Sequence, residues 1–246
     1  MLLMFVFSIP TVQTRLGSYA THSINQRYGT DISIEKVGLQ FNGDVELKTI
    51  FIKDHYDSTL ISVTELNTSI LSFVKLAENK LTFGDIDLYN LFFHIKNYEG
   101  EDETNLDVFV EKFDEKNPTL NANKFLLSSS EVRIRDSKFV LTDENLNTPK
   151  VLDFHNLNLT ASDFLILGTD IKTTIKRLNF KDTRGAQIQN LKTVFSYSLT
   201  QMAFDQLEIK SEYSTLFGQL QFDYERKDFK DFLEKVNVSE FFENST

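Results

Sequence analysis

The stretch VELKTIFI, residues 45–52, decides the fold class of this chain. Its apolar residues alternate with polar ones at Val45 and Leu47, and the alternation restarts after a two-residue gap at Ile50 and Ile52. Alternation with a period of two is typical of a β-strand that buries one face. The gap would turn the second half of a flat strand to the wrong face, so we expect a bulge or a bend there.

The same pattern occurs three more times at irregular intervals, which excludes a solenoid unit of fixed length. Repeated bulging is what a strongly curved sheet requires. We therefore predict a mainly β fold built on an elongated, strongly curved antiparallel sheet, which we call a β-groove. The further copies are Ile32, Ile34, Val37 and Leu39; Ile86, Leu88, Leu91 and Phe93; and Leu152, Phe154, Leu157 and Leu159.

Turn signals separate the predicted strands. An Asp at the end of a strand can accept a hydrogen bond from the backbone two residues further on and so start a turn. This punctuation predicts a meander of about a dozen strands whose neighbours are mostly antiparallel. The predicted strand exits are Lys53-Asp54, Arg135-Asp136, Thr142-Asp143 and Lys181-Asp182.

Two short amphipathic helices interrupt or follow the predicted strands. Thr104 or Asn105 can cap the first, near residues 104–116, and the second lies near residues 227–236. Their polar faces are acidic or mixed rather than basic. We therefore expect both helices to pack on an apolar face of the sheet rather than to bind a membrane.

The chain opens with an apolar segment that is too short to span a bilayer. Nine residues of helix rise about 14 Å, whereas a hydrocarbon core is about 30 Å thick. We expect a truncated membrane anchor, followed by a helix over residues 11–28 that ends at Gly29; the alternative is a buried hydrophobic element. The anchor residues are Met1, Leu2, Leu3, Met4, Phe5, Val6, Phe7 and Ile9.

Composition and charge exclude several classes of protein. The 246 residues are 41% hydrophobic, enough to bury a sizeable core in one large or two small domains. The net charge is −10, which would repel a phosphate backbone, so we expect no nucleic-acid partner. The absence of cysteine excludes disulfides, thiolate metal sites and cysteine nucleophiles.

The sequence contains no pattern of residues that is typical of an enzyme. The four histidines, His22, His55, His94 and His155, form neither a metal-binding spacing nor a triad motif, and there is no glycine-rich phosphate loop. We therefore predict no catalytic residue, no cofactor and no metal site, and we expect that the protein is not an enzyme. A hydrolase with unrecognised carboxylates is the weakest alternative.

Segments throughout the chain, most densely over residues 8–115, resemble one known family. They are SIP (8–10), VQT (12–14), YGTDISI (28–34), GDVEL (43–47), IKDHYDSTL (52–60), NKLTFGDI (79–86) and NLDVFV (105–110). These segments are similar to the TamB family of Bacteroidota, the inner-membrane subunit of the translocation and assembly module, in the AsmA-like superfamily. The motifs are structural rather than catalytic.

The resemblance implies a single-pass protein of the bacterial inner membrane with its body in the periplasm. Residues 1–28 would be the truncated anchor and juxtamembrane helix, and residues 29–246 the N-terminal part of a periplasmic β-groove domain. Such proteins are thought to support outer-membrane protein assembly and phospholipid transport with a BamA-type partner. Because family members are longer, we interpret the chain as an N-terminal portion without the C-terminal region that meets this partner.

A groove of this kind needs an apolar floor that contacts phospholipid acyl chains. Phenylalanines in the predicted strands would line it, although the same residues could instead fill a closed core or pack beneath the helices. A compact periplasmic β-sandwich that binds another molecule is the alternative function. The predicted groove residues are Phe83, Phe93, Phe139, Phe154, Phe180 and Phe222.

Overall fold

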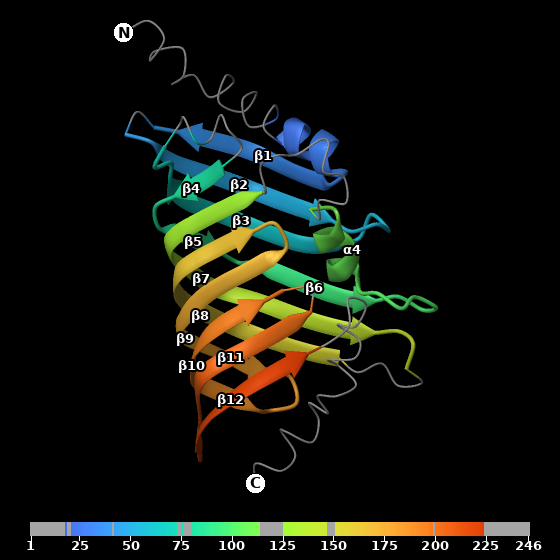
Figure 1. Cartoon of the computed structure of the whole chain (residues 1–246), viewed down its shortest axis with the longest axis vertical. Coiled ribbons are helices and arrows are strands. Elements are labelled where there is room, and N and C mark those ends of the chain that lie inside the picture. The colour runs from blue at the N-terminus through green and yellow to red at the C-terminus, as the bar shows by residue number, and fades with distance from the viewer. Residues whose placement is uncertain are drawn as a thin grey trace, which may run out of the picture.

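The computed structural model describes residues 18, 21–40, 42–72, 75, 80–113, 125–146, 151–198 and 200–223, and the statements below concern these residues. Their strands form one sheet of twelve. Figure 1 shows that the sheet is curved and that its strands follow one another along the longest axis of the molecule. The predicted mainly β fold on a curved, largely antiparallel sheet is therefore confirmed.

Ten strands follow each other across the sheet in the order β1-β2-β3-β5-β7-β8-β9-β10-β11-β12. Most neighbours in this order are antiparallel, as expected for a meander. The strands are β1 (Asp31–Leu39), β2 (Asp44–Lys53), β3 (Thr59–Ser69), β4 (Lys80–Phe83), β5 (Ile86–Tyr89), β6 (Phe92–Asn97), β7 (Leu126–Asp143), β8 (Val151–Leu167), β9 (Asp170–Asp182), β10 (Gln187–Tyr197), β11 (Gln201–Ser211) and β12 (Thr215–Asp223).

The centre of the sheet departs from a meander. The short strands β4, β5 and β6 lie one after another along the single long strand β7, and all three are parallel to it. On their other side, β5 and β6 pair with β3 in the antiparallel direction. Parallel neighbours need a crossover connection. The chain between Asn97 and Leu126 supplies it and contains the helix α4 (Asn105–Glu111).

Left-handed residues mark the places where the strand alternation shifts. Six non-glycine residues in or beside the strands have a φ between 51° and 57°. Five are the second residue of a two-residue gap between apolar positions, and the gap at Asp136 is followed by the buried Ser137. Three of the six fall in copies of the pattern that the sequence shows. This conformation bends the strand once, so apolar residues on both sides of the gap stay on one face of the sheet. The six are Thr49, Asn90, Asp136, Asn156, Asp163 and Gln206.

Asn156→Val is expected to lower the free energy of unfolding by about 1–2 kcal/mol, because a β-branched residue is strained at positive φ. Asn156 is exposed, so no packing is lost with its side chain. Asn156→Gly should leave the stability within about 0.5 kcal/mol of the parent protein. Lys172→Val, on an exposed residue of β9, controls for the added valine. Urea denaturation measures all three, and equal values for the two valine variants would contradict the bend.

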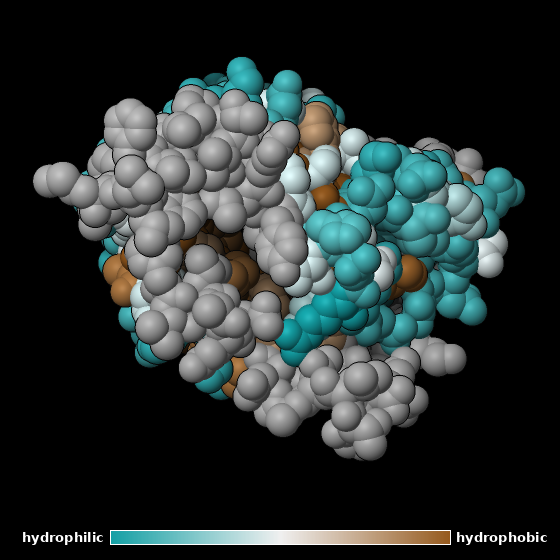
Figure 2. Space-filling model, turned by 90° about the horizontal axis from the view of Figure 1, so that it is seen from above, coloured by the Kyte–Doolittle hydropathy of each residue, from teal (hydrophilic) through white to brown (hydrophobic). Residues whose placement is uncertain are grey.

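The curvature brings together side chains of strands that are not neighbours in the sheet. A buried cluster joins Ile95 of β6 and Leu141 of β7 to Tyr197 of β10 and Met202 of β11. Strands β8 and β9 lie between these two pairs in the sheet, so the apolar face must be the concave, inner face. Figure 2 shows hydrophobic residues in a hollow at the middle of the molecule and hydrophilic residues over much of its outer surface.

The structure describes two helices, and both agree with the sequence where they can be compared. Thr104 is the N-cap of α4, and Asp107 completes a capping box with it. Leu106 of α4 packs against the buried cluster, as expected for a helix that covers an apolar face. The helix over residues 21–28 ends at Gly29, whose φ of 64° is left-handed. The helix predicted near residues 227–236 lies outside the described residues.

Asp side chains close three of the four predicted turns. In each, a carboxylate oxygen accepts a hydrogen bond from the backbone N–H two residues on, at 2.9 Å for Asp54, 3.0 Å for Asp143 and 2.7 Å for Asp182. The predicted exit at Arg135-Asp136 is wrong, because β7 continues to Asp143. Asp136 is one of the left-handed residues, and Asn158 Oδ1 accepts a hydrogen bond from its N–H at 3.1 Å. That bond bridges the bend and lets the strand continue.

Candidate functional site

A continuous row of aliphatic side chains crosses the whole inner face of the sheet. It takes one residue from each of the ten strands in the main order, and every member is paired directly with the next across a strand boundary. We call it the aliphatic row. Its members are Val37, Leu47, Leu66, Leu88, Ile134, Leu159, Leu178, Leu191, Ile209 and Leu216.

The members of the aliphatic row remain partly accessible to solvent. Nine are half-buried, and Leu216 at the end of the row is 44% exposed. By contrast, Leu60 beside the turn between β2 and β3 is fully buried. Nine strand spacings of about 4.8 Å make the row roughly 43 Å long. The row is therefore a partly exposed apolar track that crosses the strands in the direction of the long axis of the molecule.

Four of the predicted groove phenylalanines form a second row beside the aliphatic row. Phe93, Phe139 and Phe154 are paired across β6, β7 and β8, with ring centroids 5.6 and 5.7 Å apart. Phe180 of β9 stacks on Phe154 at 4.2 Å. We call these four residues the aromatic row. It broadens the apolar inner face, because each ring covers more area than an aliphatic side chain.

The other predicted groove residues lie apart from the aromatic row. Phe222 on β12 packs against the buried cluster, as Phe93 and Phe139 also do. Phe83 is half-buried on β4, and no ring contact joins it to another described aromatic residue. The predicted anchor, Met1 to Phe7 and Ile9, lies outside the described residues. Within the part of the chain that the structure describes, no helix is both long and apolar enough to cross a bilayer.

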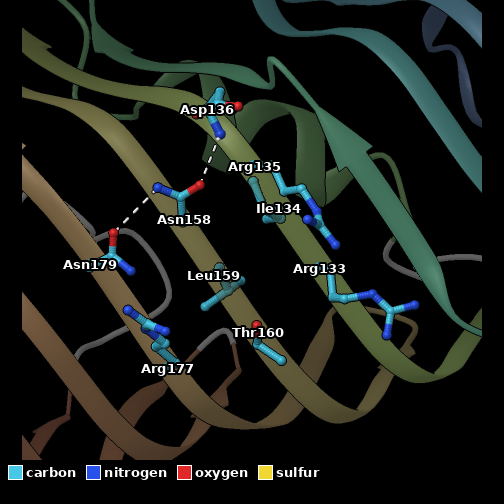
Figure 3. Close-up of a pocket in the computed structure, with 9 residues that line it drawn as sticks. All are labelled: Arg133, Ile134, Arg135, Asp136, Asn158, Leu159, Thr160, Arg177 and Asn179. Carbon is cyan, nitrogen blue, oxygen red and sulfur yellow. Dashed lines mark hydrogen bonds between the residues drawn. The ribbon is translucent and has the colours of Figure 1, made fainter.

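A polar pocket of about 420 Å³ lies on β7, β8 and β9 (Figure 3). Asn158 Nδ2 donates to Asn179 Oδ1 at 3.3 Å, and Figure 3 shows Arg177 pointing away from the two arginines of β7. The guanidinium groups therefore do not converge on one point. The pocket is lined by Arg133, Ile134, Arg135, Asp136, Asn158, Leu159, Thr160, Arg177 and Asn179.

Arg133 is neutralised by carboxylates on the outer face. Its Nε donates to Asp87 at 2.8 Å and its Nη2 to Asp85 at 3.0 Å, and its Nη1 pairs with Glu131. These hydrogen bonds raise the pKa of Arg133 and lower the pKa of Asp87. The arrangement fixes β5 to β7 by charge-assisted bonds.

The histidines do not assemble a metal or catalytic centre in the described ranges. His55 Nε2 lies 3.0 Å from Glu101 at the surface, and His94 Nε2 lies 3.1 Å from Thr142 Oγ1. Burial, helped by the nearby Lys96 charge, lowers the pKa of His94. No group of three or more His, Asp or Glu side chains is placed to hold a metal ion among the residues that the structure describes.

No protein-family model matches this chain, and no curated protein matches it significantly. The geometry of the inner face is therefore the feature that bears on function. The sequence singled out the four phenylalanines of the aromatic row but not the aliphatic row, which becomes visible only when the strand registers are known.

Proposed function

We propose that the protein is a TamB-like module of the bacterial envelope whose inner face holds the acyl chains of phospholipids during transport. The observation that supports this most directly is the aliphatic row, an apolar track that stays partly exposed over ten strands. An acyl chain requires only a continuous apolar surface.

The dimensions of the inner face suit this ligand. One leaflet of a hydrocarbon core is about 15 Å deep, half of the roughly 30 Å core. A track of roughly 43 Å therefore accommodates more than one acyl chain end to end. Each methylene taken out of water contributes about 0.8 kcal/mol, so binding strength grows with the contact length and needs no specific polar contact.

The cellular setting follows from the resemblance to the TamB family. In this proposal residues 1–9 belong to a single-pass inner-membrane anchor, and the sheet lies in the periplasm. The module supports outer-membrane protein assembly and phospholipid passage together with a BamA-type partner. The acidic, polar outer face suits an aqueous compartment, because its charges stay hydrated while the apolar face contacts lipid.

Native mass spectrometry of the full chain, purified without added lipid from bacterial membranes, tests the proposal. We expect mass adducts of one or more phospholipids, identified by lipid extraction and tandem mass spectrometry. A folded protein that carries no phospholipid, and that takes up none from vesicles of phosphatidylethanolamine and phosphatidylglycerol, would refute it. Circular dichroism of the same sample establishes that the sheet is formed.

A further inference from the structure

A buried asparagine lies beneath the segment that leads from β6 into α4. Asn97 ends β6, is 0% exposed and forms an isolated antiparallel bridge with Thr104, the N-cap of α4. Alternation along β6 places its side chain on the same face as Ile95, a member of the buried cluster. Leu106 of α4 packs against the same cluster. Residues 98–113, which we call the strap, therefore lie over the end of β6 on the inner face.

Asn97 makes this closed position of the strap costly. Within the described chain, neither its Nδ2 nor its Oδ1 has a hydrogen-bond partner. A buried polar group without a partner has given up its hydrogen bonds to water and has gained none in exchange. Such groups are rare in folded proteins. If the strap lifts, water reaches the amide, so Asn97 favours an open position of the strap.

A second buried asparagine, on the strap itself, acts in the opposite sense. Asn105 is 1% exposed, and its Nδ2 donates to Asp54 Oδ2 and to the carbonyl of His94, both at 3.1 Å. Its Oδ1 accepts a hydrogen bond from the N–H of Lys96 at 2.8 Å. These bonds tie the start of α4 to β6 and to the turn after β2. The closed strap is therefore stabilised by Asn105 and destabilised by Asn97.

We propose that the strap opens and closes over the inner face while the sheet stays formed, and that Asn97 sets this balance. No residue of the strap belongs to a strand, so opening breaks no strand pairing. At its far end the strap meets the helix before β1 through an exposed hydrogen bond, from Lys112 Nζ to the carbonyl of Gly29 at 2.8 Å, and a ring contact of Phe113 with Tyr28 at 4.8 Å. Opening would give an acyl chain access to the buried cluster, and this entrance role depends on the proposed lipid transport.

Hydrogen exchange followed by mass spectrometry tests the balance with two matched variants. Asn97→Leu and Asn105→Leu each replace a buried asparagine by a leucine of the same branched shape. In the parent protein we expect α4 to exchange at least tenfold faster than β8, because the strap opens while the sheet stays formed. Asn97→Leu should slow the exchange of α4 at least tenfold, about 1.4 kcal/mol, and Asn105→Leu should accelerate it.

These outcomes separate an opening strap from a short helix that only frays. Fraying at the C-terminal end of α4 would not respond to a residue on β6. Exchange of α4 as slow as that of β8 in the parent protein, or unchanged or faster exchange of α4 in Asn97→Leu, would overturn the proposal. Circular dichroism checks that the variants are folded, and a misfolded Asn97→Leu is replaced by Asn97→Val.

The entrance role has a measurement of its own. Uptake of a fluorescent phospholipid from vesicles of phosphatidylethanolamine and phosphatidylglycerol should be at least threefold slower for Asn97→Leu than for the parent protein. Uptake at the parent rate, in a variant whose α4 exchange is slowed, would overturn the entrance role. A parent protein that takes up no phospholipid would refute the lipid transport instead, and the exchange of α4 would still decide whether the strap opens.

Discussion

Leu66→Asp is expected to reduce the phospholipid that co-purifies with the protein at least tenfold. Leu66 lies inside the aliphatic row, where it is paired with Leu47 on one side and Leu88 on the other. An acyl chain on the track would have to desolvate the new carboxylate, and a tenfold loss corresponds to about 1.4 kcal/mol. Because Leu66 is half-buried, the carboxylate can stay hydrated in the lipid-free protein. Quantitative lipid extraction measures the effect.

The matched control is Thr64→Asp, which adds the same charge to an exposed residue of the same strand. It should retain the phospholipid content of the parent protein, and both variants should keep the far-ultraviolet circular dichroism of a β protein. If Leu66→Asp binds as much lipid as Thr64→Asp, the aliphatic row is not the binding track. If both lose lipid equally, net charge rather than the inner face controls binding.

Asp54→Asn should lower the free energy of unfolding at pH 7 by about 3 kcal/mol, the largest effect on stability that we expect. The buried carboxylate of Asp54 joins the turn after β2 to the N-terminus of α4. It accepts hydrogen bonds from Tyr98 Oη at 2.8 Å and Asn105 Nδ2 at 3.1 Å, besides two backbone N–H groups. The side-chain amide of the introduced asparagine would place an N–H donor against the groups that donate to Asp54. Hydrogen bonds to a charged group contribute about 1.5–3 kcal/mol each, and the variant loses this contribution. Asp57→Asn, an exposed residue of the same turn, is the control.

The same carboxylate gives the stability a defined pH dependence. Burial disfavours the charge of Asp54, but the hydrogen bonds from Asn105, Tyr98 and the backbone outweigh burial and hold its pKa below the ordinary value. A lowered folded-state pKa stabilises the protein above the unfolded-state pKa of about 3.9, and this contribution is lost as the pH falls through the folded-state value. The difference in unfolding free energy between parent and Asp54→Asn should therefore be constant from pH 7 to about pH 5 and shrink below about pH 4. A difference that does not change in acid would contradict the role of the charge.

Much of the strand geometry could be predicted from the sequence because the apolar pattern records the bends directly. Thr49, Asn90 and Asn156 occupy the same place in three copies of the pattern, and all three are left-handed. Further bends were not recognised. At Asp136 the buried residue after the gap is Ser137, a polar residue that conceals the pattern. The sequence at Asp136 predicted a turn because Asp is common both in turns and at left-handed positions within a strand.

The pairing of distant strands could not be predicted from alternation. Parallel and antiparallel strands have the same period of two, so nothing in β5 or β6 indicates that β7 runs parallel to both. The aliphatic row depends on that pairing, because Leu88 meets Ile134 only across the parallel junction. The site therefore required the three-dimensional register, whereas the individual apolar residues were evident beforehand.

The parallel junction also has a consequence for the order in which the chain folds. Short loops join strands β7 to β12 into hairpins. A short loop closes quickly, because few residues have to be ordered to bring the two strands together. The contact of β6 with β7 must instead wait for the long connection between Asn97 and Leu126 to close, with a greater loss of chain entropy. We therefore expect the middle of the sheet, rather than either edge, to limit the rate of folding.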